Sequence, residues 1–174
     1  MKKYIVLLLL ALIVFPVVAQ ETEPDPAVQE AKEEIAVVYD LGRFFGYVWR
    51  LQGEDFEDLA MTRDQMVEMY EVVSYVATAE RIEPDWAEEQ LDYLELDLLT
   101  PAQLMQVDMF AISREESRVP GSGAGASSGA TGTGSGPILS YVNGGAFNPI
   151  VDDTKTTGED FFSLLEFLQK ELGR

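Results

Sequence analysis

The side chains of this 174-residue chain that could do chemistry are mainly carboxylates, because the sequence has 31 Asp and Glu but no His and no Cys. Without His and Cys, no Cys nucleophile, Ser-His-Asp triad or His-ligated zinc site can be built. Paired carboxylates can still hydrolyse glycosidic bonds or hold calcium, given a suitable geometry. The densest acidic clusters are Glu54-Asp55 with Glu57-Asp58, Glu88-Glu89 with Asp92, and Asp152-Asp153.

None of these acidic clusters has the spacing of a known carboxylate site. An EF-hand loop alternates acids and places Gly and Glu at set positions, which these segments do not do. A glycosidase needs a cleft that holds two carboxylates at a fixed separation, and a small helical domain does not readily supply one. We therefore predict a protein that is not an enzyme, with no catalytic residues, no metal site and no cofactor.

One short pattern occurs twice and has a direct physical meaning. Thr62 and Gln65, like Thr100 and Gln103, are three residues apart and flanked by apolar residues. At a helix start, an N-cap Thr accepts a hydrogen bond from the backbone N–H three residues on, and the Gln side chain reaches back to the N-cap N–H. Both pairs are therefore predicted capping boxes, each stabilising its helix by about 1 kcal/mol.

The two boxes resemble the paired Leu-Thr-x-x-Gln motifs of the Spy/CpxP-type periplasmic proteins, which are helical stress proteins and chaperones. Thr62, Gln65, Thr100 and Gln103 are the matching positions, and the likeness covers roughly residues 27–118. The resemblance implies a helical fold, curved dimers and binding of other polypeptides, so a homodimer is one expected assembly. Chaperones of that group use a basic concave surface, whereas this chain has a net charge of −19.

The elements that must position these residues are helices. Apolar residues recur at spacings of three, four and seven over 27–52, 62–80, 85–98 and 100–118. We predict an all-α fold in which residues 27–118 form a small antiparallel helical bundle. Gly42 and Gly46 indicate a close helix contact or a bend, and neighbouring aromatics favour the contact. The inward face of the last segment is expected to carry Leu104, Val107 and Ala111, widened by Phe110 and Ile112.

A Gly-rich tract separates this bundle from the C-terminus. Residues 119–137 are predicted to be a flexible linker, and 138–174 a C-terminal segment. Within it, 138–142 is expected to form a short strand or extended contact, and a capped amphipathic helix should follow. Docking of that helix on its own bundle and docking in a partner's groove both remain open. Its apolar stripe consists of Phe161, Leu164, Leu165, Leu168 and Leu172.

The N-terminus has the parts of an export signal. Lys2 and Lys3 precede an apolar run over 4–18, and Val17-Val18-Ala19 offers a cleavage site. We predict a signal peptide over 1–19, a disordered leader over 20–26 and export to the periplasm or the extracellular space. No stable membrane span is expected after cleavage. The negative charge disfavours nucleic acid as a partner.

Methionines gather around the two capping boxes, and Met side chains adapt to varied apolar partners as well as filling cores. The leading interpretation is a non-catalytic exported envelope protein that binds other proteins or unfolded polypeptides, in a chaperone-like or stress-related role. The alternative is a structural or adaptor module of an envelope assembly that docks through its C-terminal helix. The candidate partner-binding methionines are Met61, Met66, Met69, Met105 and Met109.

Overall fold

The computed structural model describes residues 26–117 and 135–174. The predicted signal peptide, nearly all of the leader and most of the linker lie outside these residues. The described residues are all-α, as predicted, and their helices pack antiparallel. The elements in chain order are α1 (Pro26–Glu34), α2 (Ala36–Arg50), η1 (Glu54–Leu59), α3 (Arg63–Thr78), α4 (Pro84–Tyr93), η2 (Leu94–Leu98), α5 (Pro101–Glu116), α6 (Ser135–Val142), η4 (Pro149–Val151) and α7 (Thr156–Leu172).

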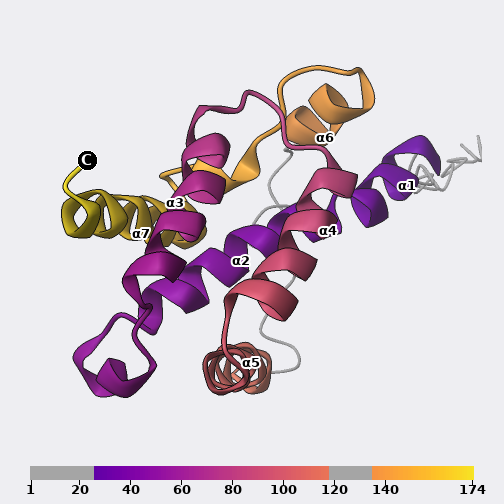
Figure 1. The fold of residues 1–174 in the computed structure, drawn as a ribbon. Coiled ribbons are helices and arrows are strands. Elements are labelled where there is room, and N and C mark those ends of the chain that lie inside the picture. The colour runs from indigo at the N-terminus through magenta and orange to yellow at the C-terminus, as the bar shows by residue number, and fades with distance from the viewer. Residues whose placement is uncertain (1–25, 118–134) are drawn as a thin grey trace, which may run out of the picture.

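Helix α2 runs through the centre of the molecule, and α4, α5 and α7 contact it (Figure 1). Its fully buried Val38, Leu41, Phe45 and Val48 follow the helical spacings of three and four, so they share one face. Burying such a stripe against neighbouring helices is the main source of stability for helices of this length. The core therefore forms around α2.

The C-terminal helix α7 is part of this core. Phe161, Leu164 and Leu168 are fully buried, and α7 contacts both α2 and α3. The ring centroids of Phe45 and Phe161 are 5.7 Å apart. Of the two arrangements open from the sequence, the structure shows the helix docked on its own bundle.

The two glycines of α2 permit this close docking. The helix continues through both Gly42 and Gly46 without a break. A Cβ at Gly42 would lie 3.0 Å from a methyl carbon of Thr157, and one at Gly46 would lie 3.1 Å from a carboxylate oxygen of Asp160. The interpretation of a close helix contact is therefore confirmed, and α7 is the partner helix.

Two local expectations in the C-terminal segment are wrong. Residues 138–142 belong to helix α6, which packs on α1 with Ile138 and Tyr141 buried, so they form neither a strand nor an extended contact. Helix α7 begins after Lys155, which provides no side-chain cap. Tertiary contact outweighs local pattern at both places, because a short helix gains its stability mainly by burying an apolar face.

The inward face of α5 is also rotated from the expected one. Gln103, Val107 and Phe110 are the buried residues of this helix, while Ile112 is exposed. Gln103 turns into the interior, and the helical period then carries Ile112 to the outer side.

Among the described residues, no helix has the length and apolar content to cross a bilayer.

Candidate functional site

Both predicted capping boxes are present. The Thr62 side-chain oxygen accepts a hydrogen bond from the backbone N–H of Gln65 at 3.3 Å, and the Gln65 side-chain oxygen accepts one from the Thr62 N–H at 2.9 Å. Thr100 and Gln103 repeat this arrangement with the same two distances. Thr62 and Thr100 are thus the N-caps of α3 and α5, and each box satisfies two backbone donors at a helix start.

The two boxes also meet each other. Gln65 Nε2 donates to Gln103 Oε1 at 2.8 Å, and Gln103 Nε2 lies 3.3 Å from Gln65 Oε1. Each amide also donates to the backbone just before the other box: Gln65 to Leu98 O at 2.8 Å, and Gln103 to Leu59 O at 3.0 Å. We call this reciprocal pair of glutamines the glutamine clasp.

The glutamine clasp is a structural cross-link rather than a ligand site. Gln65 and Gln103 are only 9% and 4% exposed, and every amide nitrogen and oxygen of the pair has a protein partner. Buried amides that are fully hydrogen-bonded fix the relative position of the elements they join. The clasp therefore sets where α5 starts with respect to α3.

The candidate methionines fall into two groups. Met61 and Met69 are buried and Met66 is half-buried, so these three pack in or against the core. Met105 and Met109 lie on α5 and are 62% and 55% exposed. Packing therefore occupies the methionines near the first box, while those after the second box face outward.

The exposed methionines continue into a stripe. Ile112 is 57% exposed and follows Met105 and Met109 at positions i+7 and i+3, so the three side chains lie along one side of α5. We call these three residues the α5 stripe. Exposed apolar side chains are common when scattered singly, but a contiguous set on one helix is typical of an interaction surface.

A groove borders the stripe between α2, α4 and α5. It encloses about 580 Å³, and Ile112 belongs to both the groove and the stripe. We call it the α5 groove. Its floor is apolar and includes Phe44, Tyr47, Leu91, Val107 and Ala111. Its charged lining residues are five acids and two arginines, namely Asp40, Glu95, Asp108, Glu115 and Glu116 with Arg43 and Arg114.

The charge of this groove is predominantly negative. Arg43 forms an ion pair with Asp40, which uses one of the two positive charges within the lining. Burial raises the pKa of Glu95, and the charges of Asp108 and Asp92 raise it further. The Glu95 carboxyl resists ionisation because burial removes water from its charged form and two like charges lie near it. The groove thus combines apolar contact area with a field that attracts cations.

The apolar stripe of the C-terminal helix is not a free partner-binding surface in this structure. Phe161, Leu164 and Leu168 are fully buried against the bundle, and Leu165 and Leu172 are half-buried. The assignment of these five residues to partner binding stays a prediction, and in this structure their apolar side chains pack in or against the protein's own core. Their burial stabilises the protein's own fold.

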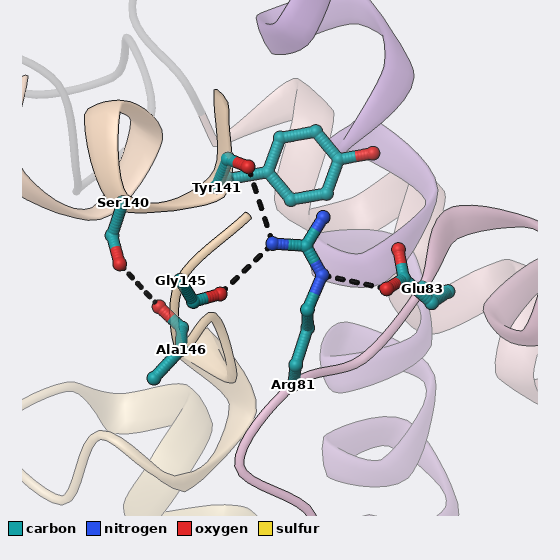
Figure 2. Close-up of polar contacts among 6 residues, drawn as sticks. All are labelled: Arg81, Glu83, Ser140, Tyr141, Gly145 and Ala146. Atoms are coloured by element: carbon teal, nitrogen blue, oxygen red, sulfur yellow. Dashed lines mark hydrogen bonds and ion pairs between the residues drawn. The ribbon is translucent and has the colours of Figure 1, made fainter. Parts of the chain in front are cut away.

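An arginine holds the C-terminal segment to the bundle at a second place, which Figure 2 shows. The Arg81 guanidinium lies 4.3 Å from the ring centroid of Tyr141 and donates to the carbonyls of Tyr141 at 3.1 Å and Gly145 at 2.8 Å. Its Nε pairs with Glu83 at 2.6 Å. Burial, followed by a hydrogen bond with Glu34, raises the pKa of Tyr141 to about 12. The sequence analysis did not single out Arg81. The one feature of the sequence that could have indicated its role is that it is a lone positive residue in a strongly acidic chain.

Backbone pairing continues this attachment. The Phe147 N–H donates to Glu80 O at 2.9 Å, and the Ile82 N–H donates to Phe147 O at 2.8 Å. The Asn148 side chain donates to Val76 O at 2.7 Å. Residues 135–174 are therefore integrated with the bundle by polar contacts as well as by the apolar face of α7.

The acidic clusters do not converge on a metal site in the part of the chain that the structure describes. No group of three or more Asp or Glu side chains is arranged there as metal ligands. The described acids instead lie mostly at the surface, where they contribute to the negative charge of the protein.

No protein-family model matches this chain, and no curated protein or solved structure shows a significant match to it. The function must therefore be argued from the α5 stripe, the α5 groove and the charge of the protein.

Proposed function

We propose that this chain is a non-catalytic exported envelope protein that binds other polypeptides in a chaperone-like, stress-related role. The observation that carries the proposal is the α5 stripe, whose Met105, Met109 and Ile112 are each more than half exposed beside the α5 groove with its apolar and acidic lining. Thioether side chains are flexible and polarizable, so they adapt to apolar partners of different shape. Such a surface suits weak, reversible contact with many sequences.

The acidity of the chain supports the same role. A net charge of −19 keeps the free protein soluble, and it would also keep a complex with an aggregation-prone client in solution. The α5 stripe supplies the attraction, while the surrounding carboxylates oppose association between complexes. In this proposal apolar side chains bind the client, and acidic side chains keep the complex soluble.

The test is suppression of client aggregation by residues 20–174, which include every described residue, followed by light scattering of an unfolding client. Replacing Met105 and Met109 with Gln should reduce the suppression several-fold. A matched control replaces Leu139 with Gln and Val142 with Thr, because both residues are exposed apolar positions on α6, and no residue of α6 lines the α5 groove. If the wild-type protein leaves aggregation unchanged, the chaperone-like function is wrong.

The adaptor function has less support. It assigns docking to the C-terminal helix, whose Phe161, Leu164 and Leu168 are buried in the protein's own core. A partner could reach them only if α7 left α2 and α3.

The proposal of export rests on the sequence of residues 1–19. The mass of the mature protein recovered from the cell envelope or medium would test it.

A further inference from the structure

The α5 groove selects for ligand charge as well as for apolarity. Tyr47 and Leu91 are half-buried in its lining and Ile112 is exposed, so an apolar side chain entering it would displace water from apolar surface. Asp108 and Glu95 line the same groove, and both lie within reach of a side chain seated there. A ligand that matches both features carries apolar residues on one side and cations beside them.

A second copy of this chain fits the groove poorly. Each copy carries a net charge of −19, and a two-fold interface places the same surface of both copies face to face. The acidic rim would then oppose an identical rim well within the Debye length of about 8 Å at physiological salt. Like-charge repulsion at such an interface disfavours a homodimer through this face.

We infer that the α5 groove binds a cationic amphipathic segment of a client polypeptide, with apolar side chains on the floor and Lys or Arg beside Asp108 and Glu95. This inference rests on the proposed function and deepens it by naming the class of segment that is bound. The α5 stripe extends the apolar contact beyond the groove, since Ile112 belongs to both surfaces.

The electrostatics of Glu95 agree with this assignment. Burial raises its pKa first, and Asp108 and Asp92 add to the effect. A cation placed among these three carboxylates would relieve their mutual repulsion and restore charge balance to a partly buried site. A cationic ligand therefore binds more favourably beside these carboxylates than beside an isolated carboxylate at the surface.

The experiment compares three short dye-labelled peptides that share the same Leu positions and carry Lys, Gln or Glu at all other positions. Fluorescence anisotropy gives each dissociation constant for residues 20–174 at low and at high salt. The Lys peptide should bind at least about tenfold more tightly than the Glu peptide, and salt should reduce that difference.

Two pairs of substitutions locate the binding site. Asp108→Asn with Glu95→Gln should weaken the Lys peptide by about threefold to tenfold and leave the Gln peptide unchanged. Glu166→Gln with Glu171→Gln removes the same net charge from exposed positions of α7 and should change neither. Circular dichroism of each variant confirms that the fold persists.

The outcomes separate the two claims. Equal binding of the Lys and Glu peptides overturns the inference, as does an equal loss of affinity in the α7 control pair. A homodimer in sedimentation that dissociates when Met109 is replaced by Asp overturns it too. Aggregation suppression without charge discrimination leaves the proposed function standing, whereas charge-selective binding in the groove without suppression supports the inference and overturns the chaperone-like role.

Discussion

Replacing Gln103 with Leu should destabilise the protein far more than the loss of an ordinary helix cap. Gln103 is buried, and its amide serves α5, Gln65 and the backbone before α3 at the same time. Leucine has a similar volume and leaves no large cavity, so the change isolates the hydrogen bonds. The measurement is the free energy of unfolding in urea, followed by circular dichroism.

The expected magnitude follows from which groups lose their partners. Without the Gln103 amide, the Thr100 N–H, the Leu59 carbonyl and one N–H of the Gln65 amide each lose a hydrogen bond. Gln65 keeps its bonds to Leu98 O and to the Thr62 N–H. Three groups without partners cost about 1–2 kcal/mol each, so the expected loss is about 3–6 kcal/mol. Thr100→Ala, which removes only the side-chain cap, should cost about 1 kcal/mol.

A double-mutant cycle tests the contact between the two glutamines directly. Gln65→Leu and Gln103→Leu together remove both partners and leave an apolar pair, so the double variant should be more stable than the sum of the single losses predicts. We expect a coupling free energy of about 1–2 kcal/mol. Additivity within about 0.5 kcal/mol would show that the glutamine clasp does not exist in solution.

Three further perturbations probe the rest of the fold. Phe161→Ala should lower the unfolding free energy by about 3–5 kcal/mol, because the ring is fully buried where α7 packs on α2, and a urea midpoint like that of the wild type would contradict this packing. Gly158→Ala should lower the urea midpoint strongly, since its Cβ would lie 2.1 Å from a backbone oxygen, whereas Gly46→Ala should lower it less because its Cβ would lie 3.1 Å from the Asp160 carboxylate; equal losses would contradict this packing. The Tyr93 pKa is raised to about 12, chiefly by its hydrogen bond with Glu68, so a spectrophotometric titration should show this pKa falling in Glu68→Gln. Because the Tyr93 pKa in the folded state exceeds the usual value of 10, the stabilisation of the fold by the neutral Tyr93 hydroxyl is full below pH 10 and is lost between pH 10 and 12. An unchanged Tyr93 pKa in Glu68→Gln would refute the assignment of this shift to Glu68.

Sequence reasoning succeeded where the determining interactions are local. The helical segments before residue 118 followed from apolar residues three and four apart, although 27–52 divides into α1 and α2 and 85–98 into α4 and η2. The capping boxes followed from Thr and Gln three apart, a pattern that acts within one turn. The close contact at Gly42 was also predictable, although its partner helix was not. Nothing in a local window indicates that Ile150 and Thr157 fill the space beside that glycine.

The meeting of the two boxes could not be predicted in the same way. Gln65 and Gln103 are 38 positions apart, and their contact depends on how the intervening helices turn. Each glutamine oxygen already accepts a hydrogen bond from the N-cap N–H of its own box, so the box pattern did not point to a contact between the two glutamines. The amide nitrogens were the one clue, since a capping box uses only the side-chain oxygen and leaves two N–H donors to be placed.

This second role decides which face of α5 reaches solvent. If only apolar residues of α5 faced the core, Ile112 would point inward. Because the polar Gln103 is buried instead, α5 is rotated about its axis so that Val107 and Phe110 point inward. Met105, Met109 and Ile112 then face outward beside the acidic groove. The glutamine clasp and the proposed binding surface are therefore consequences of the same rotation. A clasp variant that still folds should bind clients less well even though neither glutamine lies in the groove.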